Sequence, residues 1–144
     1  CLHRMRHTMQ HLHLYEPAEF IDKYVLSELE ITPLDACVAV HVTCSTKQMG
    51  LAETIVRVAK ACANNVLVPE EIGCCAFAGD KGFTDPELNE WALRKLKPQI
   101  QKAGATMGVS NSRTCEIGLT THSGIEYHSI AHLVNMTSKR KGDK

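Results

Sequence analysis

Cys37-Val-Ala-Val-His-Val42 is a short run of mostly small and β-branched residues with little polar interruption. Such a run is typical of a strand that is buried on both faces, as in a parallel sheet. The turn Thr43-Cys44-Ser45 follows directly, and either Ser45 or Thr46 can cap a helix there. The segment therefore predicts a strand, a turn that carries a cysteine, and a helix whose apolar stripe contains Leu51, Ile55, Val58, Ala59 and Cys62.

A second unit of the same kind follows along the chain. Asn65-Val-Leu-Val-Pro69 predicts its strand, and Gly73-Cys-Cys-Ala-Phe-Ala-Gly-Asp-Lys-Gly82 is the loop beyond that strand. Pro86 then opens a helix with apolar residues at Leu88, Trp91, Ala92 and Leu96. We expect Pro98 to kink or restart this helix, because proline lacks the amide hydrogen of the intrahelical bond, and Gly104 to end it.

A third unit completes the pattern. Ala105-Thr-Met-Gly-Val109 predicts a strand, residues 110–115 its turn, and residues 116–120 the start of a short helix. Ile125-Glu-Tyr127 then predicts a last short strand. Ser129 is expected to cap a final helix.

Strands that alternate with helices predict an α/β domain with a mostly parallel sheet, built from strand-turn-helix units whose turns carry the cysteines. In such sheets, ligands gather at the carboxyl ends of the strands. Four cysteines lie just beyond such an end, on three different turns: Cys44, Cys74, Cys75 and Cys115. We therefore expect their sulfurs to converge on one point. Cys37 and Cys62 are expected as packing residues instead, and Cys1 is given no role.

Adjacent cysteines such as Cys74 and Cys75 have several structural explanations. They can close a strained disulfide ring, remain two free thiols of which one is buried, or face one inorganic centre together. The glycines around them let the backbone come close to whatever the sulfurs hold. The placement of Cys44 and Cys115 favours a metal or cluster over the other two explanations.

The bulk composition limits the class of protein. The chain has 144 residues with 44% hydrophobic content, enough for one compact domain whose core needs neither disulfides nor metal to fold. Its formal net charge is zero, with 16 basic and 16 acidic residues, which argues against nucleic acid as a partner. Its 7 cysteines are an odd number without the spacing of a small secreted framework, and they indicate ligation or redox chemistry in a reducing compartment.

Neither a membrane span nor a signal peptide is visible in the sequence. No apolar run approaches the roughly 18 residues that a membrane-spanning helix needs, and the N-terminus lacks the apolar core of a signal peptide. We therefore expect a cytoplasmic protein, with peripheral binding at the inner face of the membrane as a variant of that location.

The expected organisation has three parts. Residues 1–15 are a linker or fragment end, residues 16–136 are a cysteine-rich domain that begins with a helix over 18–29, and residues 137–144 are a charged, solvated tail. The chain starts with cysteine in place of methionine. This indicates a segment cut from a longer polypeptide.

The cysteines lie in three stretches that resemble a known family: His41-Val-Thr-Cys-Ser45, residues 70–83 and residues 110–119. Between Cys44 and the Cys-Cys pair lie 29 residues, and 39 more precede Cys115. This arrangement is similar to the cysteine-rich "CCG" domain of heterodisulfide reductase subunits, of the iron-sulfur subunits of glycolate oxidase and anaerobic glycerol-3-phosphate dehydrogenase, and of FAD-linked D-lactate dehydrogenases. Over about residues 16–136 the chain most resembles the C-terminal region of the last group.

The resemblance implies an electron-transfer domain that binds one iron-sulfur cluster, of the 4Fe-4S type, through Cys44, Cys74, Cys75 and Cys115. It also implies an FAD-binding domain elsewhere in the same polypeptide, which would oxidise D-lactate or a similar 2-hydroxy acid. A cytochrome or a quinone would accept the electrons. The domain alone would then be part of an oxidoreductase and not itself catalytic.

The sequence departs from the family pattern at two positions. Ala76 stands where the motif usually has a glycine, and Ser112 stands in place of the first cysteine of a final Cys-x-x-Cys pair. Four thiols suit an ordinary four-thiolate cluster and argue against the non-cubane cluster associated with heterodisulfide reductase. Beside the expected ligands, Lys81 and Arg113 either offset the negative charge of the centre or are solvated surface charges.

Two other functions fit the same cysteines. A four-cysteine zinc site, structural or for docking, uses the same tetrahedral thiolates. A metal-free thiol-disulfide enzyme or redox sensor would use Cys74 and Cys75, although the sequence contains no Cys-x-x-Cys pair. His41 is expected as a core histidine with satisfied hydrogen bonds, and no catalytic set follows from the spacing of His122, His128 and His132.

Overall fold

A four-stranded parallel sheet forms the centre of the computed structural model, which describes residues 2–142. The strand order is β3-β2-β4-β5, and all three neighbouring pairs run parallel. The bounds are β2 Leu34–Val40, β3 Ala63–Leu67, β4 Ala105–Ser110 and β5 Tyr127–Ser129. The α/β fold with a mostly parallel sheet, predicted from the alternation of strand and helix patterns, is confirmed.

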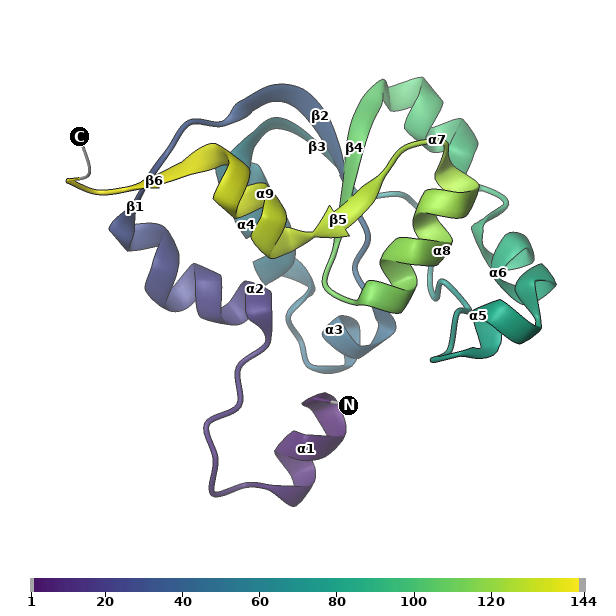
Figure 1. Cartoon of the computed structure of the whole chain (residues 1–144), viewed down its shortest axis with the longest axis horizontal. Coiled ribbons are helices and arrows are strands. Elements are labelled where there is room, and N and C mark those ends of the chain that lie inside the picture. Colours follow the sequence, from purple (N-terminus) through teal and green to yellow (C-terminus); the bar gives the residue numbers. More distant parts are fainter. Residues whose placement is uncertain (1, 143–144) are drawn as a thin grey trace.

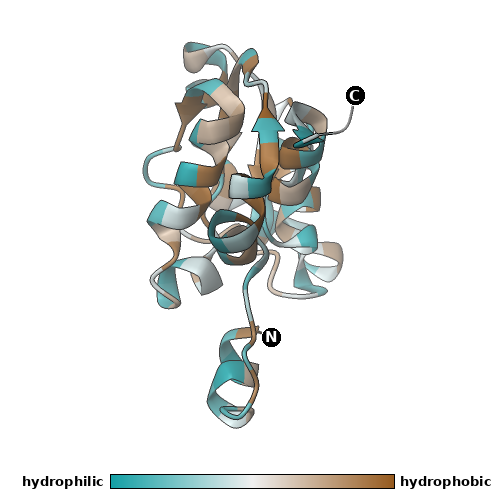
Figure 2. Ribbon diagram, turned by 90° about the vertical axis from the view of Figure 1, so that its left-hand side faces the viewer, coloured by the Kyte–Doolittle hydropathy of each residue, from teal (hydrophilic) through white to brown (hydrophobic). Residues whose placement is uncertain are grey.

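Helices cover both faces of this sheet (Figure 1). On one face, α4 (Ala52–Cys62) and α9 (Ile130–Thr137) pack over Val38, Val40 and Val109. On the other face, α6 (Pro86–Leu93), α7 (Leu96–Ala103) and α8 (Arg113–Ser123) lie over a second core. That core contains Ala39, Leu93, Leu96, Ile100, Leu119 and Tyr127. Figure 2 shows the apolar residues gathered in the strands and on the inner sides of the helices.

The first strand-turn-helix unit begins its helix earlier than predicted. Thr43, and not Ser45 or Thr46, is the N-cap of α3 (Cys44–Gln48), and its hydroxyl accepts a hydrogen bond from the Thr46 amide at 3.2 Å. Thr43 is a better N-cap than Ser45 or Thr46 because it lies nearer to the end of β2, with an extended backbone and a buried side chain. Gly50 has a φ of 72°, a left-handed conformation that separates α3 from α4.

The second unit matches the expected effects of its prolines and glycine. After the short α5 (Lys81–Thr84), Pro86 is the first residue of α6. The helix restarts as α7, so that Pro98 falls in the first turn, where a missing amide hydrogen costs little. Gly104 ends α7 in a left-handed conformation, as predicted.

The third unit differs from its prediction in one respect that matters for the site. Helix α8 begins at Arg113, three residues before the expected start, and Cys115 therefore lies in its first turn. The side chain of Ser129 caps α9 by accepting a hydrogen bond from the His132 amide at 3.2 Å, as expected.

The two ends of the described chain differ most from the sequence prediction. The helix expected over 18–29 is divided into α2 (Pro17–Phe20), a π-helical segment η1 (Ile21–Val25) and a 3-10 segment η2 (Leu26–Glu28). The segment after Thr137, expected as a solvated tail, forms β6 (Ser138–Arg140), which pairs antiparallel with β1 (Leu29–Ile31). The side chains of Lys139 and Arg140 stay exposed while their backbone pairs.

Residues 1–15, expected as a linker, contain the helix α1 (Leu2–Thr8), which stands apart from the sheet and its helices (Figures 1 and 2). An ion pair from Arg6 to Glu19 connects it to α2. Cys1 and residues 143 and 144 lie outside the described residues. Within residues 2–142, no helix combines the length and the apolar character needed to cross a bilayer.

The contact between Gly108 and Tyr127 gives a test of this packing. A Cβ atom at Gly108 of β4 would lie 2.5 Å from ring atoms of the buried Tyr127, so Gly108→Ala forces the ring to move. We expect this substitution to lower the free energy of unfolding by about 1–3 kcal/mol, measured by guanidinium denaturation. Gly73→Ala is the control, because no atom lies within 4 Å of its added methyl group; equal midpoints for both variants would contradict the packing.

Candidate metal centre

The four cysteines predicted as ligands all lie at one edge of the sheet. Cys44 is the first residue of α3, Cys74 and Cys75 lie in the loop between β3 and α5, and Cys115 is in the first turn of α8. These segments follow β2, β3 and β4, which are neighbours in the sheet and run in the same direction. The structure therefore brings the three cysteine-bearing segments together, and the predicted ligand role of each cysteine remains a prediction.

Two of the four sulfurs form a close, buried pair. The Sγ atoms of Cys75 and Cys115 are 2.7 Å apart, and the residues are 3% and 8% exposed. Their hydrogen bond lowers the pKa of the Cys75 thiol to about 7 and raises the pKa of Cys115, with burial raising the latter further. The lowered pKa makes Cys75 the readier of the two thiols to bind a metal near neutral pH.

The other two cysteines face solvent. Cys44 and Cys74 are both exposed. Partial burial raises the pKa of the Cys74 thiol, an amide hydrogen bond from Ala76 at 3.3 Å opposes this shift, and the nearby thiols of Cys44 and Cys75 raise the pKa again. The four sulfurs thus form an inner pair and an outer pair.

His41 joins the inner pair, which the sequence prediction missed. One of its ring nitrogens and the Sγ atoms of Cys75 and Cys115 all lie within 4.8 Å of one another. His41 is 2% exposed, and its Nε2 has no hydrogen-bond partner among residues 2–142, so the expectation of a satisfied core histidine is wrong. Burial, followed by the positive charge of Lys47, lowers its pKa to about 4, so the ring is neutral at pH 7.

Two more buried polar groups lie on the same face of the sheet. Val40 and Val109 are paired and belong to one core, so the alternation of side chains puts His41 and Ser110 on the opposite face. Tyr127 also lies on that face, with its ring against Gly108. Within the described chain, neither Ser110 Oγ nor the Tyr127 hydroxyl has a hydrogen-bond partner. The alternation of side chains along each strand is enough to identify these residues, once it is known that Cys75 lies on this face of the sheet.

The loop that carries Cys74 and Cys75 is held by side chains outside it. The Asn89 amide of α6 donates a hydrogen bond to the Cys75 carbonyl, and Asn89 is itself buried. Phe77 is buried, and its ring lies where a side chain at Gly82 or Gly118 would otherwise be. Ala76 has a φ of 56°, in the left-handed region, and Ala78 has a φ of 46°. This explains why a glycine is suited to the position of Ala76.

The two cations expected beside the ligands are paired with carboxylates. Lys81 lies 3.7 Å from Asp85, and Arg113 lies 3.1 Å from Glu116. Both cations are exposed, so neither is held against the sulfurs. Their positions favour the interpretation as surface charges.

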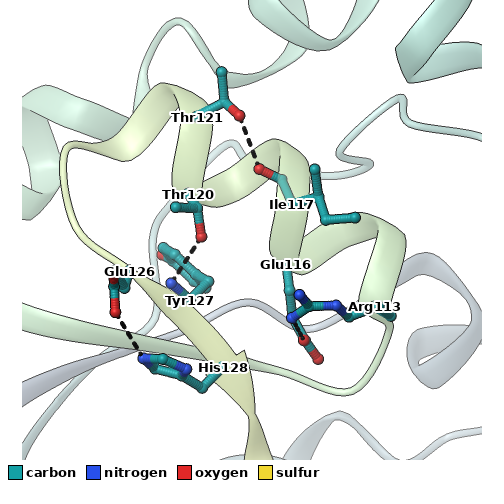
Figure 3. Close-up of a pocket in the computed structure, with 8 residues that line it drawn as sticks. All are labelled: Arg113, Glu116, Ile117, Thr120, Thr121, Glu126, Tyr127 and His128. Carbon is teal, nitrogen blue, oxygen red and sulfur yellow. Dashed lines mark hydrogen bonds and ion pairs between the residues drawn. The ribbon is translucent and has the colours of Figure 1, made fainter.

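A separate hollow of about 360 Å³ lies between α8 and β5 (Figure 3). Figure 3 shows its charged groups already paired, Arg113 with Glu116 and Glu126 with His128, while the Thr120 hydroxyl accepts a hydrogen bond from the Tyr127 amide. His132 packs against His128, with ring centroids 4.7 Å apart. His128 thus contacts Glu126 and His132, and the prediction that these histidines form no catalytic set stays a prediction.

The donor set fits a thiolate-bound metal centre. Thiolates with an imidazole are ligands for zinc, for iron and for iron-sulfur clusters, whereas magnesium and calcium prefer oxygen. His41 has one ring nitrogen close to two buried sulfurs, and its Nε2 has no partner among the described residues. An unsatisfied buried nitrogen at such a place is expected where a metal would complete the site. Cys62, which is fully buried in the other core with a pKa raised by burial, is a packing residue as predicted, and Cys37 is half-buried.

Comparison with family models identifies the cysteine-bearing part of the chain. A family model described as a cysteine-rich domain, CCG, matches residues 38–120. This range contains His41 and all four cysteines of the site. No curated protein matches the chain.

The left-handed conformation of Ala76 leads to a stability test. Replacement by glycine removes a steric cost of about 1 kcal/mol but adds some chain entropy to the unfolded state, so Ala76→Gly should raise the free energy of unfolding by about 0.5 kcal/mol. Ala92→Gly, in the last turn of α6, should lower it by up to about 1 kcal/mol. Chemical denaturation of the metal-free protein measures both, and changes of the same sign would argue against the conformation at Ala76.

Burial of His41 predicts a pH dependence of stability in the metal-free protein. Its pKa is about 4 when folded and about 6.5 when unfolded, so the unfolded state binds more protons between these values. The contribution is complete above about pH 6.5 and is lost as the pH falls towards 4, by about 3 kcal/mol. His41→Leu should flatten this slope and, by removing an unpaired buried nitrogen, raise stability at pH 7. A slope unchanged in His41→Leu would contradict the assignment.

Proposed function

Since the chain belongs to the CCG cysteine-rich domain family, we propose that it is an electron-transfer domain that binds one 4Fe-4S cluster through Cys44, Cys74, Cys75 and Cys115. The observation that carries this proposal is the meeting of three cysteine-bearing segments at the carboxyl edge of neighbouring parallel strands. The cluster would supply one-electron storage. The chain's own residues set its position and its surroundings.

Several residues have clear tasks in such a domain. The amide of Ala76, which points at the Cys74 sulfur, stabilises a thiolate there. Asn89 fixes the Cys75 carbonyl and so the direction of the neighbouring side chain. The apolar core around Cys75 and Cys115 keeps water from the inner side of the site, which influences the reduction potential.

The wider context is proposed from the resemblance of the sequence to FAD-linked D-lactate dehydrogenases. We place a flavin domain of the same polypeptide, which oxidises a 2-hydroxy acid such as D-lactate, before this domain in the electron path. A cytochrome or quinone follows it. The proposed location is the cytoplasm or the inner face of the membrane.

A zinc-binding structural or docking module is the second candidate. The proximity of His41 to Cys75 and Cys115 favours it, because mixed histidine and cysteine ligands are common in structural zinc sites. Metal analysis separates the two candidates, since zinc without sulfide supports the module and iron with sulfide supports electron transfer. Neither metal, with loss of two thiols on mild oxidation, would support a thiol redox domain. The sequence suggests Cys74 and Cys75 for this role, and the short distance between the sulfurs favours Cys75 and Cys115 instead.

The proposed ligands give a direct prediction. Protein reconstituted anaerobically should hold about four iron and four sulfide per chain, measured by chemical assay and visible absorbance. Cys75→Ser should lose most of this cluster, because it removes a buried ligand at the centre of the site. Cys62→Ser is the matched control, as Cys62 is a buried cysteine of the opposite core and should retain the cluster. Loss of the cluster in the control but not in Cys75→Ser would reject the ligand set.

A further inference from the structure

His41 lies where a metal ligand would lie. It follows the last residue of β2 by one position and precedes Cys44 by three. Its amide donates a hydrogen bond to the Val109 carbonyl at 2.9 Å, which holds the backbone against β4 beyond the end of the strand. The ring therefore extends from a rigid sheet edge towards Cys75 and Cys115, and not from a mobile loop.

Other buried polar residues of this protein show what is unusual about His41. The Thr43 hydroxyl pairs with Thr46, the Asn89 amide with the Cys75 carbonyl, and the Thr137 hydroxyl with the Leu133 carbonyl. Buried polar groups are normally satisfied in this way. In contrast, the unpartnered buried side-chain atoms of the described residues are His41 Nε2, Ser110 Oγ, Asn111 Oδ1 and Tyr127 OH. All four lie on β5 or at the carboxyl ends of β2 and β4, beside the cysteine segments.

We propose that His41 is itself a ligand of the metal centre, bound through a ring nitrogen on its buried side next to Cys75 and Cys115. Three elements then supply the inner donors: the end of β2, the loop after β3 and the first turn of α8. Cys44 and Cys74 supply thiolates from the solvent side. This inference rests on the proposed function only for the nature of the bound group, since an imidazole binds zinc and iron alike.

The assignment has a chemical consequence. A neutral imidazole adds no negative charge, whereas each thiolate adds one. A 4Fe-4S cluster takes four protein ligands, one on each iron, so in such a cluster His41 takes the place of one of the four cysteines; exchange of a thiolate for a neutral imidazole favours the reduced form and raises the reduction potential. A hydrogen bond from His41 to a thiolate would also raise the potential, so the potential alone does not distinguish a ligand from a neighbour.

A nuclear spin coupling does distinguish them. The protein, labelled with ¹⁵N in its histidine rings, is made metal-free under anaerobic conditions and loaded with ¹¹³Cd²⁺ alone, a probe that accepts thiolate and imidazole ligands. We expect one ring nitrogen, assigned to His41, to show direct scalar coupling to the cadmium. The coupling should vanish in His41→Leu and persist in His132→Leu, a matched control because His132 is an exposed histidine.

Affinity provides an independent measurement. The affinity for Co²⁺ is measured by titration. Loss of a residue that only hydrogen-bonds to a metal ligand costs about 10–100-fold in metal affinity. His41→Leu should cost more than about 100-fold and should change the ligand-field spectrum, while His132→Leu should change neither. Circular dichroism and thermal unfolding of the metal-free variants verify that each is folded.

The outcomes separate this inference from the proposed function. Cadmium bound by thiolates with no coupling to any ring nitrogen of the wild-type protein would overturn the role of His41, and this measurement needs no variant to fold. Iron and sulfide analysis of a second sample, reconstituted anaerobically with iron and sulfide, reports on the cluster independently. If a cluster forms but no nitrogen coupling is seen, only the role of His41 as a ligand is rejected. If nitrogen coupling is seen but no cluster forms, only the electron-transfer function is rejected.

Discussion

The parallel alignment of β2, β3 and β4 is the constraint on which the site depends. Because parallel strands all end at the same edge, each crossover must return the chain to the opposite edge before the next strand begins. The cysteines after these strands are thus neighbours in space although 29 or more residues separate one strand's cysteines from the next in the chain. The hydrogen bonds of the ladder, and not contacts among the cysteines, place the cysteine-bearing segments together.

The site contains backbone conformations and buried polar groups that are unfavourable on their own. Two alanines of the cysteine loop adopt left-handed backbone conformations, and buried polar atoms beneath the loop lack partners among the described residues. Features of this kind cost free energy and persist where the surrounding structure enforces them. Here the enforcement comes from Phe77 and Asn89, which anchor the loop against α6 and α8.

Much of the fold could be predicted from the sequence, because short runs of apolar and β-branched residues alternate with helices that begin at proline or serine and end at glycine. The edge that gathers the cysteines followed from that alternation alone. The cap at Thr43 and the start of α8 were missed because adjacent Ser and Thr residues compete as caps. The β1–β6 pair was missed since both strands are short and far apart in sequence. His41 was misjudged because a sequence pattern indicates burial but not whether a ring nitrogen has a partner.

Strand β2 separates two kinds of residue by parity alone. Val38 and Val40 face a core of mainly apolar side chains, while Ala39 and His41 face the side that holds the cysteines. Neighbouring residues of this strand therefore influence different properties of the protein. Changes at the even positions would alter how much of the folded protein accumulates, and changes at the odd positions would alter what the folded protein binds. A library that varies His41 while Val38 and Val40 are kept could tune the chemistry of the site and leave the core on the opposite face as it is.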